Sequence, residues 1–469
     1  MSISLSSTDL TIVVLAGGMG KRMHSNLPKV LNRLGNQTLI EHVLTAANKL
    51  NPLETIVVIP PGQQVIFEQC ITNKDLKWVT QTQALGTAHA LQQALPYVTT
   101  ENVLVLYGDV PMIKTDLLIS LIDQCQGKMG IITALTTSPY GYGRIVRDSK
   151  QAITAIVEQK DCDEKTNAIQ EINTGIGYYP VKFIKEYWKK IDNNNKQKEF
   201  YLTDYIKLWA EQDTLAHITT HDLTSVTGIN TLVELNHAER LWQQDYALKL
   251  MQQGVYIADP QRFDCRGNLE AQPGSNIDIN CIINGKVSLG KHSKIGANCV
   301  LENVTIGENV TIKPFTILRN TQVESHAQIG PFTFAKDQTH IASHAQIGSF
   351  VEAKCTYLGS HSKANHLAYL GNLRIQERVN IGAGVIHCNY NGIEKFTSTI
   401  QADAFIGANT NIIGPAIVEN HATIGAGSTI SKKAPAHKLT LSRSTQKTVE
   451  GWLSPRQKQQ QTEQDSIDN

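Results

Sequence analysis

The segment at positions 15–23, Leu-Ala-Gly-Gly-Met-Gly-Lys-Arg-Met, combines three glycines with two cations. A further cation, Lys29, follows in the segment Leu-Pro-Lys-Val-Leu at positions 27–31. Glycines let the backbone turn tightly and come close to a ligand. Exposed backbone amides beside cations are suited to phosphate groups. The two segments therefore predict a polyphosphate-binding site.

Two common phosphate motifs do not fit these residues. A P-loop has Ser or Thr after its Gly-Lys pair, but Gly20-Lys21 is followed by Arg22. The dinucleotide fingerprint needs a third glycine where Met23 stands. A purely structural turn would explain the glycines but not the arginine and the later Pro-Lys pair. The whole pattern, Leu-x-Gly-Gly-x-Gly-x-Arg followed by Pro-Lys, resembles the signature of sugar-1-phosphate nucleotidyltransferases.

Elements that position this site are predicted from the alternation of apolar β-rich runs with amphipathic stretches. The expected strands are Thr11–Leu15, Thr55–Ile59, Val103–Leu106 and Ile131–Leu135, and the expected helices are Leu39–Leu50 and Thr87–Leu95. Such alternation is typical of a doubly wound, mostly parallel sheet. Ligands bind beyond the carboxyl ends of the strands in these sheets, which is where the glycine segment falls.

Further polar residues fall at similar strand ends. Gln81 can pair with the imide edge of a pyrimidine, and Gly86 would let the backbone approach it. Asp109 directly follows a strand, so it can hold Mg²⁺ beside phosphates, although Gly-Asp after a strand is often only a turn. Glu158 and Asn173 offer groups suited to sugar hydroxyls and an amide, with solvated loop polarity as the alternative.

Taken in order, these segments resemble the uridylyltransferase half of the bacterial bifunctional N-acetylglucosamine-1-phosphate uridylyltransferase and glucosamine-1-phosphate acetyltransferase, the bacterial GlmU family. The resemblance covers nearly the whole chain. It implies UTP and UDP-N-acetylglucosamine contacts at Leu15, Ala16, Gly17, Gly18, Arg22, Lys29, Gln81, Gly86, Thr87, Tyr107, Gly108, Asp109, Gly143, Glu158, Asn173 and Asn230.

Within that set the resemblance implies specific roles. Arg22 and Lys29 would contact phosphates, and Asp109 and Asn230 would bind Mg²⁺. Uracil contacts would be Gly17, Gln81 and Gly86, and sugar contacts would be Gly143, Glu158 and Asn173. The chain departs from the family at Met19 and Lys21, where the family commonly has a polar residue and a Ser or Thr.

A helix is predicted over residues 231–253, with Gly254 as its stop. It would link two domains and place on one side the apolar residues Leu235, Ala238, Leu241, Leu248 and Met251.

From Val255 the pattern changes to short β-branched runs separated by Gly, Asn and Ser. Apolar residues recur every six positions, and the series are Ile400, Ile406, Ile412, Val418, Ile424 and Ile430; Val323, Ile329, Ala335, Ile341 and Ile347; and Leu358, Ala364 and Leu370. A sustained hexapeptide period indicates a parallel β-helix, with one aliphatic residue per short strand filling the axis. The largest interruption, Ala383–Thr399, predicts a segment that leaves the solenoid and is free to reach a neighbouring chain.

This half resembles the left-handed β-helix of hexapeptide acyltransferases, which usually form trimers with active sites between subunits. The resemblance rests on the segment Lys363–Gly371 around His366 and on Asn389-Tyr390. It makes His366 the base that takes a proton from the attacking amine, a role for which an imidazole is apt. A histidine chosen at random among the 15 in the chain would more often be structural.

The same resemblance implies two sets of contacts in the repeats. Glucosamine-1-phosphate would contact Lys336, Lys354, Tyr369, Asn380 and Lys395, and acetyl-CoA would contact Ala383, Asn389, Tyr390, Ala408, Ala426 and Arg443. Departures from the family are Phe334 and Lys336 for two arginines, Asp337-Gln338 for Pro-Gly, Asn365 for a glycine and Ala408 for a serine. Lys336 keeps its charge but lacks the two-pronged geometry of arginine.

Composition narrows the remaining classes. The 469 residues favour two or three domains, and 41% hydrophobic residues allow large cores. A net charge of +1 gives no reason to expect nucleic acid. No apolar run approaches the length of a membrane span and no secretory signal is evident. The eight scattered cysteines fit reduced thiols in a cytoplasm.

The sequence thus predicts an α/β Rossmann-like nucleotidyltransferase domain (1–231), a linker helix (232–253), a left-handed β-helix acetyltransferase domain (254–443) and a partly disordered tail (444–469). The resemblance implies a cytoplasmic homotrimer that acetylates glucosamine-1-phosphate from acetyl-CoA. It then joins N-acetylglucosamine-1-phosphate to UTP with Mg²⁺, for peptidoglycan and lipopolysaccharide synthesis. Two alternatives are a nucleotidyltransferase whose solenoid only trimerises the chain, and an inactive scaffold. His366 argues against the first alternative, and the phosphate-binding residues argue against the second.

Overall fold

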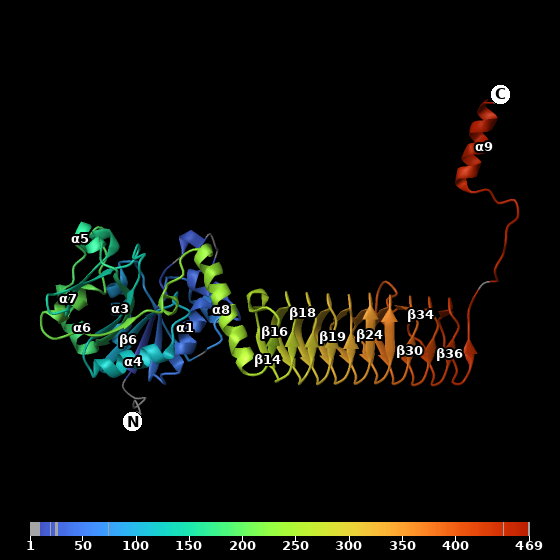
Figure 1. Ribbon diagram of the computed structural model, residues 1–469, viewed down its shortest axis with the longest axis horizontal. Helices are drawn as coiled ribbons and strands as arrows, with labels where there is room; N and C mark the ends of the chain where they lie inside the picture. The colour runs from blue at the N-terminus through green and yellow to red at the C-terminus, as the bar shows by residue number, and fades with distance from the viewer. Residues whose placement is uncertain (1–9, 19, 24–26, 74, 444, 468–469) are drawn as a thin grey trace. The chain divides into compact units, whose positions relative to one another are not determined.

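The computed structural model describes residues 10–18, 20–23, 27–73, 75–443 and 445–467. The chain divides into two compact units (Figure 1). The first comprises Met1–Gln252 with Asp259–Asn268, and the second comprises Gln253–Ala258 with Leu269–Asn469. The segment Asp259–Asn268, which the sequence analysis places with the repeats, thus belongs to the first unit. The departure noted at Met19 lies outside the described residues.

A mixed sheet forms the centre of the first unit. Its order is β11 (Ala216–Thr220), β7 (Gly130–Leu135), β10 (Glu171–Pro180), β6 (Asn102–Tyr107), β1 (Leu10–Leu15), β4 (Glu54–Ile59) and β5 (Lys77–Thr80). Only β10 runs antiparallel to its neighbours along this path. The strands β8 (Arg144–Arg147) and β9 (Ile153–Val157) join through β10. The predicted doubly wound, mostly parallel sheet is confirmed, and its strand order reverses between β1 and β6.

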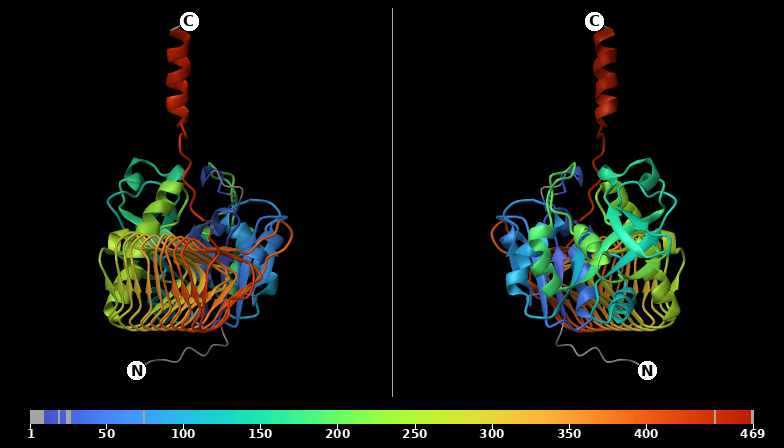
Figure 2. Two further views of the ribbon diagram at one scale, coloured as in Figure 1. Left: turned by 90° about the vertical axis from the view of Figure 1, so that its right-hand side faces the viewer. Right: turned by 90° about the vertical axis from the view of Figure 1, so that its left-hand side faces the viewer.

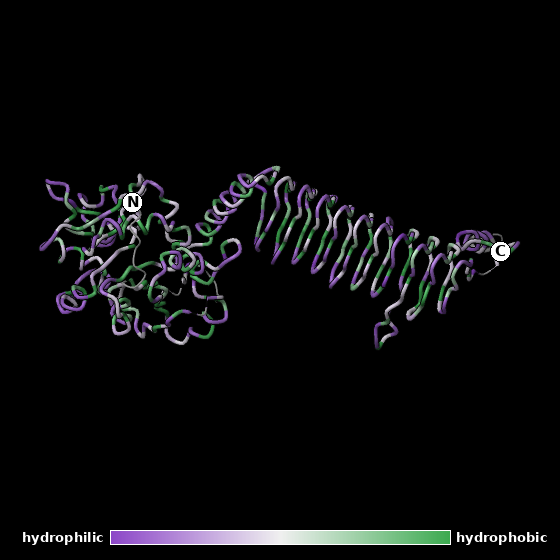
Figure 3. The backbone as a smooth tube through the Cα atoms, turned by 90° about the horizontal axis from the view of Figure 1, so that it is seen from below, coloured by the Kyte–Doolittle hydropathy of each residue, from purple (hydrophilic) through white to green (hydrophobic). Residues whose placement is uncertain are grey.

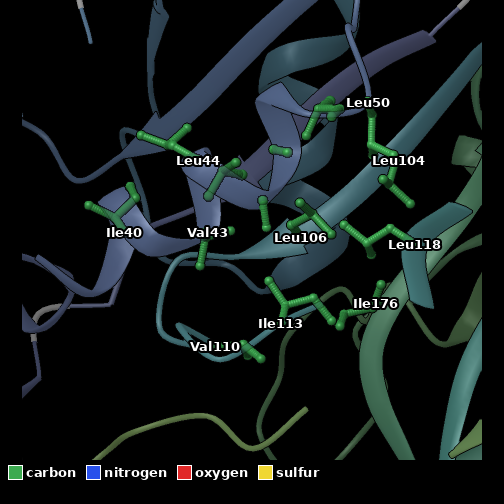
Figure 4. Packing of buried hydrophobic residues seen from close by; sticks show 14 of the residues in the cluster. Ile40, Val43, Leu44, Leu50, Leu104, Leu106, Val110, Ile113, Leu118 and Ile176 are labelled. Carbon is green, nitrogen blue, oxygen red and sulfur yellow. The ribbon is translucent and has the colours of Figure 1, made fainter. Parts of the chain in front are cut away.

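Helices cover both faces of this sheet. One face carries α1 (Leu39–Asn48), α2 (Gln64–Cys70) and α4 (Thr115–Cys125), and the other carries α3 (Thr87–Ala94), α6 (Val181–Tyr187) and α7 (Asp204–Ala210). Because side chains alternate along a strand, Ile12 and Val14 of β1 enter the first core while Val13 and Leu15 enter the second. Figure 4 shows part of the first core, where leucines and isoleucines of α1, β6 and α4 converge.

Helix α1 begins with a capping box. The Thr38 hydroxyl accepts from the Glu41 amide at 3.3 Å, and the Glu41 carboxylate accepts from the Thr38 amide at 2.9 Å. The other Glu41 oxygen accepts from the amide and the hydroxyl of Thr72 at 3.1 and 3.0 Å. Burial opposes ionisation of this carboxyl, yet the hydrogen bonds outweigh burial and lower the pKa of Glu41. The Glu41 carboxylate therefore connects the start of α1 to the segment after α2 through hydrogen bonds.

The predicted linker helix is α8 (Leu232–Gln252). Trp242 on α8 packs against His42 at 5.9 Å and against Tyr246 at 5.2 Å between ring centroids, and Gln243 bonds the backbone of Cys265 at 2.8 Å in both directions. Of the apolar residues predicted to share one side of this helix, Leu248 and Met251 are 47% and 39% exposed, so only part of that side is packed. The aromatic residues and Gln243 set the packed face, so it is rotated from the aliphatic one. The buried residues of α8 are Ala238, Gln243, Ala247 and Leu250.

The second unit is a left-handed parallel β-helix. One stack of strands contains β12 (Tyr256–Ile257), β15 (Asn276–Ile277), β17 (Lys294–Ile295), β19 (Thr311–Ile312), β21 (Gln328–Ile329), β24 (Gln346–Ser349), β27 (Lys363–His366), β30 (Asn380–Ile381), β33 (Phe405–Ile406), β36 (Thr423–Ile424) and β38 (Leu439–Thr440). Viewed end-on, the successive coils of this unit overlie one another (Figure 2).

Two further stacks share the longer strands β16 (Ile282–Leu289), β18 (Val300–Ile306) and β20 (Ile317–Val323) and then separate. One continues through β22 (Phe334–Lys336), β25 (Glu352–Lys354), β28 (Tyr369–Gly371), β31 (Ile386–Cys388), β34 (Asn411–Ile413) and β37 (Thr429–Ile430). The other continues through β23 (Thr339–Ile341), β26 (Tyr357–Leu358), β29 (Leu373–Ile375), β32 (Ser398–Ile400) and β35 (Ile417–Val418).

The hexapeptide prediction is confirmed, because every residue of the three predicted series is at most 4% exposed. Short hydrophobic stretches repeat from coil to coil in the backbone view of Figure 3. The corners carry residues stacked across coils, such as His326, His344 and His361, whose ring centroids are 4.7 and 4.8 Å apart. The axis is thus filled as a column of aliphatic side chains.

Two segments depart from the regular coils. Residues 389–397, between β31 and β32, leave the solenoid as a projecting loop (orange in Figure 2). Helix α9 (Pro455–Ile467) lies within the tail 444–469, which the sequence analysis predicts to be partly disordered. Lys, Arg and Gln are good helix formers, and the Ser454 hydroxyl accepts from the Gln457 amide at 3.3 Å as an N-cap. Within the described residues no helix is long and apolar enough to cross a membrane.

We expect Glu41→Gln to destabilise the first unit by about 1–2 kcal/mol at neutral pH, because the neutral amide cannot accept all four hydrogen bonds. A carboxyl whose pKa is lowered by folding stabilises above its unfolded pKa, roughly 4.3 for glutamate, and this contribution is lost as the pH falls through the folded pKa. The difference between variant and wild type should therefore vanish in acid. Urea unfolding followed by tryptophan fluorescence measures it, since Trp78, Trp188, Trp209 and Trp242 all lie in the first unit.

Glu186→Gln is the matched control, because this carboxylate is exposed on α6. A Glu41→Gln penalty that stayed constant from neutral pH to strong acid would contradict an ionised Glu41 in the folded protein.

Candidate functional sites

Four polar side chains meet at the reversal point of the first sheet. The Lys29 ammonium donates to Asp109 Oδ2 and, at 2.9 Å, to Asn230 Oδ1. Arg22 Nη2 donates to the same Asn230 oxygen at 3.1 Å. The Lys29 and Asp109 side chains are only 11% and 17% exposed. Four residues predicted to bind phosphates or metal are therefore brought together.

The sheet explains why segments far apart in the chain converge there. Leu15 at the end of β1 is paired with Tyr107 at the end of β6, and the Gly108 amide donates to the Leu15 carbonyl at 3.0 Å. The Ile229 amide then donates to the Asp109 carbonyl at 2.9 Å. Asp109 follows Gly108 and Asn230 follows Ile229, so each of these backbone contacts positions a predicted site residue.

A cavity of about 320 Å³ opens beside this cluster. Ten residues predicted as nucleotide contacts line it: Leu15, Ala16, Gly17, Gly18, Lys29, Gln81, Gly86, Thr87, Tyr107 and Asp109. The lining also contains Val30, Ala84, Ala90 and Glu199, which the sequence analysis does not identify. Ala84 and Ala90 flank the Gly86 motif and could have been found from it. Glu199 belongs to a polar loop with no motif, so no sequence signal points to it.

The predicted uracil contacts lie against one another. A Cβ atom at Gly17 would fall 2.8 Å from Gln81 Oε1, so a larger residue at position 17 would displace the Gln81 amide. Gln81 Nε2 donates to the Gly86 carbonyl at 3.1 Å, which holds the amide in place. Gly86 has a φ of +107° and would meet the Phe200 carbonyl with a side chain. The Gln81 amide and the backbone at Gly17 and Gly86 therefore face the cavity.

The predicted sugar contacts form a second group, outside the lining of that cavity. The Asn173 amide donates to the Gly143 carbonyl at 2.8 Å, and the Glu158 carboxyl lies 3.5 Å from where a Cβ at Gly143 would stand. Burial, and then the charges of neighbouring carboxylates, raise the pKa of Glu158 despite a 3.2 Å hydrogen bond from Thr203. Burial, and then the charge of Glu158, raise the pKa of Tyr107, which lines the cavity.

The donor set suits a small hard cation. Asp109 Oδ2 and Asn230 Oδ1 both lie within reach of one ammonium group, so two oxygen ligands converge on one position occupied by positive charge. Mg²⁺ prefers one or two protein oxygens completed by water and phosphate. Across the described residues, no group of three or more His, Cys, Asp or Glu side chains is arranged to hold a metal. The site therefore fits Mg²⁺ that arrives with a phosphate ligand better than a resident zinc ion.

In the second unit, three of the five predicted glucosamine-1-phosphate contacts lie on one stack of strands, whereas Asn380 belongs to another stack and Lys395 to the projecting loop. Lys336 is in register with Lys354, and Tyr369 stands on the next coil in β28. Each lysine already has a carboxylate partner, Lys336 with Glu352 at 2.9 Å and Lys354 with Asp337 at 3.2 Å. Asp337 is one of the positions at which the chain departs from the family. The chain therefore holds a carboxylate beside the lysines that are predicted to contact the sugar phosphate.

His366 ends β27, and residues 366–368 turn the corner into β28, which begins at Tyr369. The His366 ring is exposed and makes no hydrogen bond within the described part of the chain. His366 and Tyr369 are separated by this corner, in which Leu367 has a φ of +46° and is 62% exposed. The imidazole is thus accessible to a ligand on this corner.

The predicted acetyl-CoA contacts extend along the repeats. Strand pairing aligns Ile381, Ile406 and Ile424 on consecutive coils. An alanine stands two residues after each of these isoleucines, so the alanines stack as well; they are Ala383, Ala408 and Ala426. The Arg443 side chain lies 3.6 Å from where a Cβ at Gly425 would stand, so it meets the end of this column. Asn380 begins β30, next to Lys363 of β27.

Two neighbouring residues predicted to contact acetyl-CoA, Asn389 and Tyr390, lie in different surroundings at the start of the projecting loop. Asn389 is 6% exposed and donates to Asn372 Oδ1 at 2.7 Å, whereas Tyr390 is 57% exposed and is bridged to Lys395. The sequence analysis misses His387, which fills an axis position and bonds the Ser398 hydroxyl at 2.7 Å. Burial lowers the pKa of His387. The hexapeptide pattern does not predict a buried histidine at this axis position, because an aliphatic residue normally occupies it.

Known protein families match both units. Residues 12–174 match the MobA-like NTP transferase domain. In the solenoid, residues 286–313 match the hexapeptide repeat of succinyl-transferase, and residues 397–432 match the bacterial transferase hexapeptide of six repeats.

Full-length relatives are also similar. The bifunctional protein GlmU of Cupriavidus pinatubonensis is 42% identical over 455 residues, which cover 96% of this chain and 100% of the relative. The proteins of the same name from Francisella philomiragia and Nitrosospira multiformis are each 42% identical and cover 95% of this chain, with 99% and 98% of their own lengths matched. The chain therefore belongs to the bifunctional GlmU family and, as its motifs predict, is a bifunctional transferase that makes UDP-N-acetylglucosamine.

Proposed function

We propose that the first unit joins UTP to N-acetylglucosamine-1-phosphate at the cavity beyond β1 and β6. Uracil would lie against Gly17, Gln81 and Gly86, and the phosphates would contact Arg22 and Lys29. The sugar would contact the second group, Gly143, Glu158 and Asn173. The observation that carries this assignment is the convergence of Lys29, Asp109 and Asn230 beside a cavity lined by ten of the residues assigned to the nucleotide.

Asp109 and Asn230 would hold Mg²⁺, which neutralises charge on the triphosphate when it is bound. Lys29 now occupies the position between these two oxygens. In the loaded site its ammonium would turn toward the phosphates, and Arg22 would leave Asn230 for the same reason. These residues orient the α-phosphate of UTP for in-line attack by the sugar phosphate, with pyrophosphate as the leaving group. No protein nucleophile is required for this step.

The second unit would acetylate glucosamine-1-phosphate. His366 Nε2 or Nδ1 would accept a proton from the sugar amine as the nitrogen attacks the thioester carbon of acetyl-CoA, and the CoA thiolate leaves. Lys336, Lys354, Tyr369, Asn380 and Lys395 would hold the sugar phosphate. The column of Ala383, Ala408 and Ala426, with Arg443, would leave room for the coenzyme, beside Asn389 and Tyr390.

A homotrimer is the assembly that we propose. It is supported by the projecting loop, where Tyr390 is 57% and Ile393 is 91% exposed, because apolar side chains on an ordered loop favour a covering partner. Sedimentation equilibrium would give three times the chain mass of 51.7 kDa, and a monomer that acetylates at full rate would contradict it. UTP and acetyl-CoA are intracellular metabolites, so a cytoplasmic location follows from the proposed substrates.

Asp109→Asn should lower Mg²⁺-dependent pyrophosphate release by at least about 10²-fold, because a charged ligand beside the developing phosphate charge is replaced by a neutral one. Acetyl transfer in the same preparation should be unchanged. Asp116→Asn, at an exposed carboxylate in the first turn of α4, serves as the control. Near-normal pyrophosphate release by Asp109→Asn would show that Asp109 is only a turn residue.

His366→Ala should lower acetyl transfer by about 10²–10⁴-fold, the usual effect of removing a general base. The residual rate should rise with pH, because the amine must then lose its proton to solvent. Thiol release from acetyl-CoA measures this activity, and uridylylation of supplied N-acetylglucosamine-1-phosphate should not change. His361→Ala is the control, since that imidazole is exposed and stacks on His344. If both variants acetylate within about threefold of wild type, far from the expected range, His366 is structural.

A further inference from the structure

Arg144 is the largest fully buried side chain in the described part of the protein, with 1% of its surface exposed. It begins β8, directly after the proposed sugar contact Gly143. Burying a guanidinium is costly unless its N–H groups are satisfied. Its bonding partners should therefore indicate what the buried charge is retained for.

Its partners lie on three separate segments. Nη1 donates to the Tyr142 carbonyl, and Nη2 donates to Gln159 Oε1 at 2.8 Å and Asn167 Oδ1 at 3.2 Å. Gln159 extends the network, because its oxygen accepts from the Gly141 amide at 2.9 Å and its Nε2 donates to Asn167 Oδ1 at 3.0 Å. All of these acceptors are neutral. The guanidinium thus joins the 141–143 loop, the turn after β9 and helix α5 (Glu164–Asn167).

The strand register places Arg144 among the three proposed sugar contacts. Arg144 is paired with Val157 of β9 and with Ile172 of β10. Glu158 follows Val157, and Asn173 follows Ile172. Gly143 precedes Arg144 and accepts the Asn173 amide at 2.8 Å. Each sugar contact is therefore one residue from Arg144 or from one of its register partners.

We propose that Arg144 is a positioning residue for the sugar, fixing the spacing of Gly143, Glu158 and Asn173 through Gln159 and Asn167. This inference rests on the proposed sugar-binding role of those three residues. A planar fork of five N–H donors can bridge acceptors on several segments at once. A lysine ammonium concentrates three donors at one point and cannot span the same acceptors.

Calorimetric titration of the full-length protein with UDP and with UDP-N-acetylglucosamine tests this role. Arg144→Lys should weaken UDP-N-acetylglucosamine binding by about tenfold or more, because misplaced contacts lose much of their effect. Its affinity for UDP should stay within about twofold, since the uracil and phosphate residues lie outside the network. In steady-state assays the KM for N-acetylglucosamine-1-phosphate should rise while the KM for UTP does not.

Arg147→Lys is the matched control. Arg147 is also on β8, but its guanidinium is paired with Glu171 at 2.7 and 2.8 Å, away from the Gln159 network. We expect this control to leave the ratio of the two affinities unchanged. Gln159→Leu should act in the same direction as Arg144→Lys, and it keeps the test available if Arg144→Lys fails to fold.

An equal loss of affinity for UDP and for UDP-N-acetylglucosamine in both network variants would overturn the positioning role, because it would indicate general damage to the unit. Unchanged affinity for both ligands would overturn it as well. A wild-type protein that binds UDP-N-acetylglucosamine no more tightly than UDP would instead contradict the proposed sugar site itself.

Discussion

The contact around which the candidate site of the first unit is built is the one between the Lys29 ammonium and the oxygens of Asp109 and Asn230. These side chains come from the segment after β1, the end of β6 and the segment before α8. A lysine that is 11% exposed cannot be left unpaired without a large cost in free energy. The same holds for Asp109. Any ligand that takes one member of the pair must therefore supply a partner for the other, and a triphosphate with its metal ion satisfies both requirements together.

The second unit meets a different constraint, because the axis of a parallel β-helix admits mainly one aliphatic side chain per strand. His387 is accommodated there only with Ser398 and the Gly371 carbonyl as bonding partners. On the outside of the coils, Asp337 and Glu352 pair with the lysines assigned to a phosphate. A phosphate at this face would have to compete with these carboxylates for the lysines, so it would bind less tightly than at a site of unpaired cations.

Most of the architecture could be predicted from local pattern. β1 and β6 are continuous apolar runs, and the hexapeptide phase alone identifies the axis residues. The residues at strand ends, such as Gly17 and Asp109, could be placed because a doubly wound sheet collects its ligands there. What pattern could not give is the pairing of side chains distant in the chain. Glu199 at the cavity, Arg144 between three strands and Asp337 beside Lys354 all depend on contacts across 15 or more positions or on loops without a motif.

The differences from the sequence-based expectations have physical causes as well. Trp242 and Gln243 outweigh the aliphatic stripe of α8, so Leu248 and Met251 are exposed. In the tail that the sequence analysis predicts to be partly disordered, the polar residues Pro455–Ile467 have high helix propensity and a serine cap, and they form α9.

The stacked coils also give the second unit a direction. In a solenoid each repeat is stabilised only by its immediate neighbours, so order is lost from an end inward rather than all at once. Arg443 lies beyond β38, Ala426 follows β36 and Ala408 follows β33, whereas His366 on β27 lies deeper in the stack. Fraying from the carboxyl-terminal coil would therefore release the proposed coenzyme contacts one after another while the histidine was still held. A coenzyme bound at the proposed contacts would touch several of these outer coils at once and so oppose their fraying.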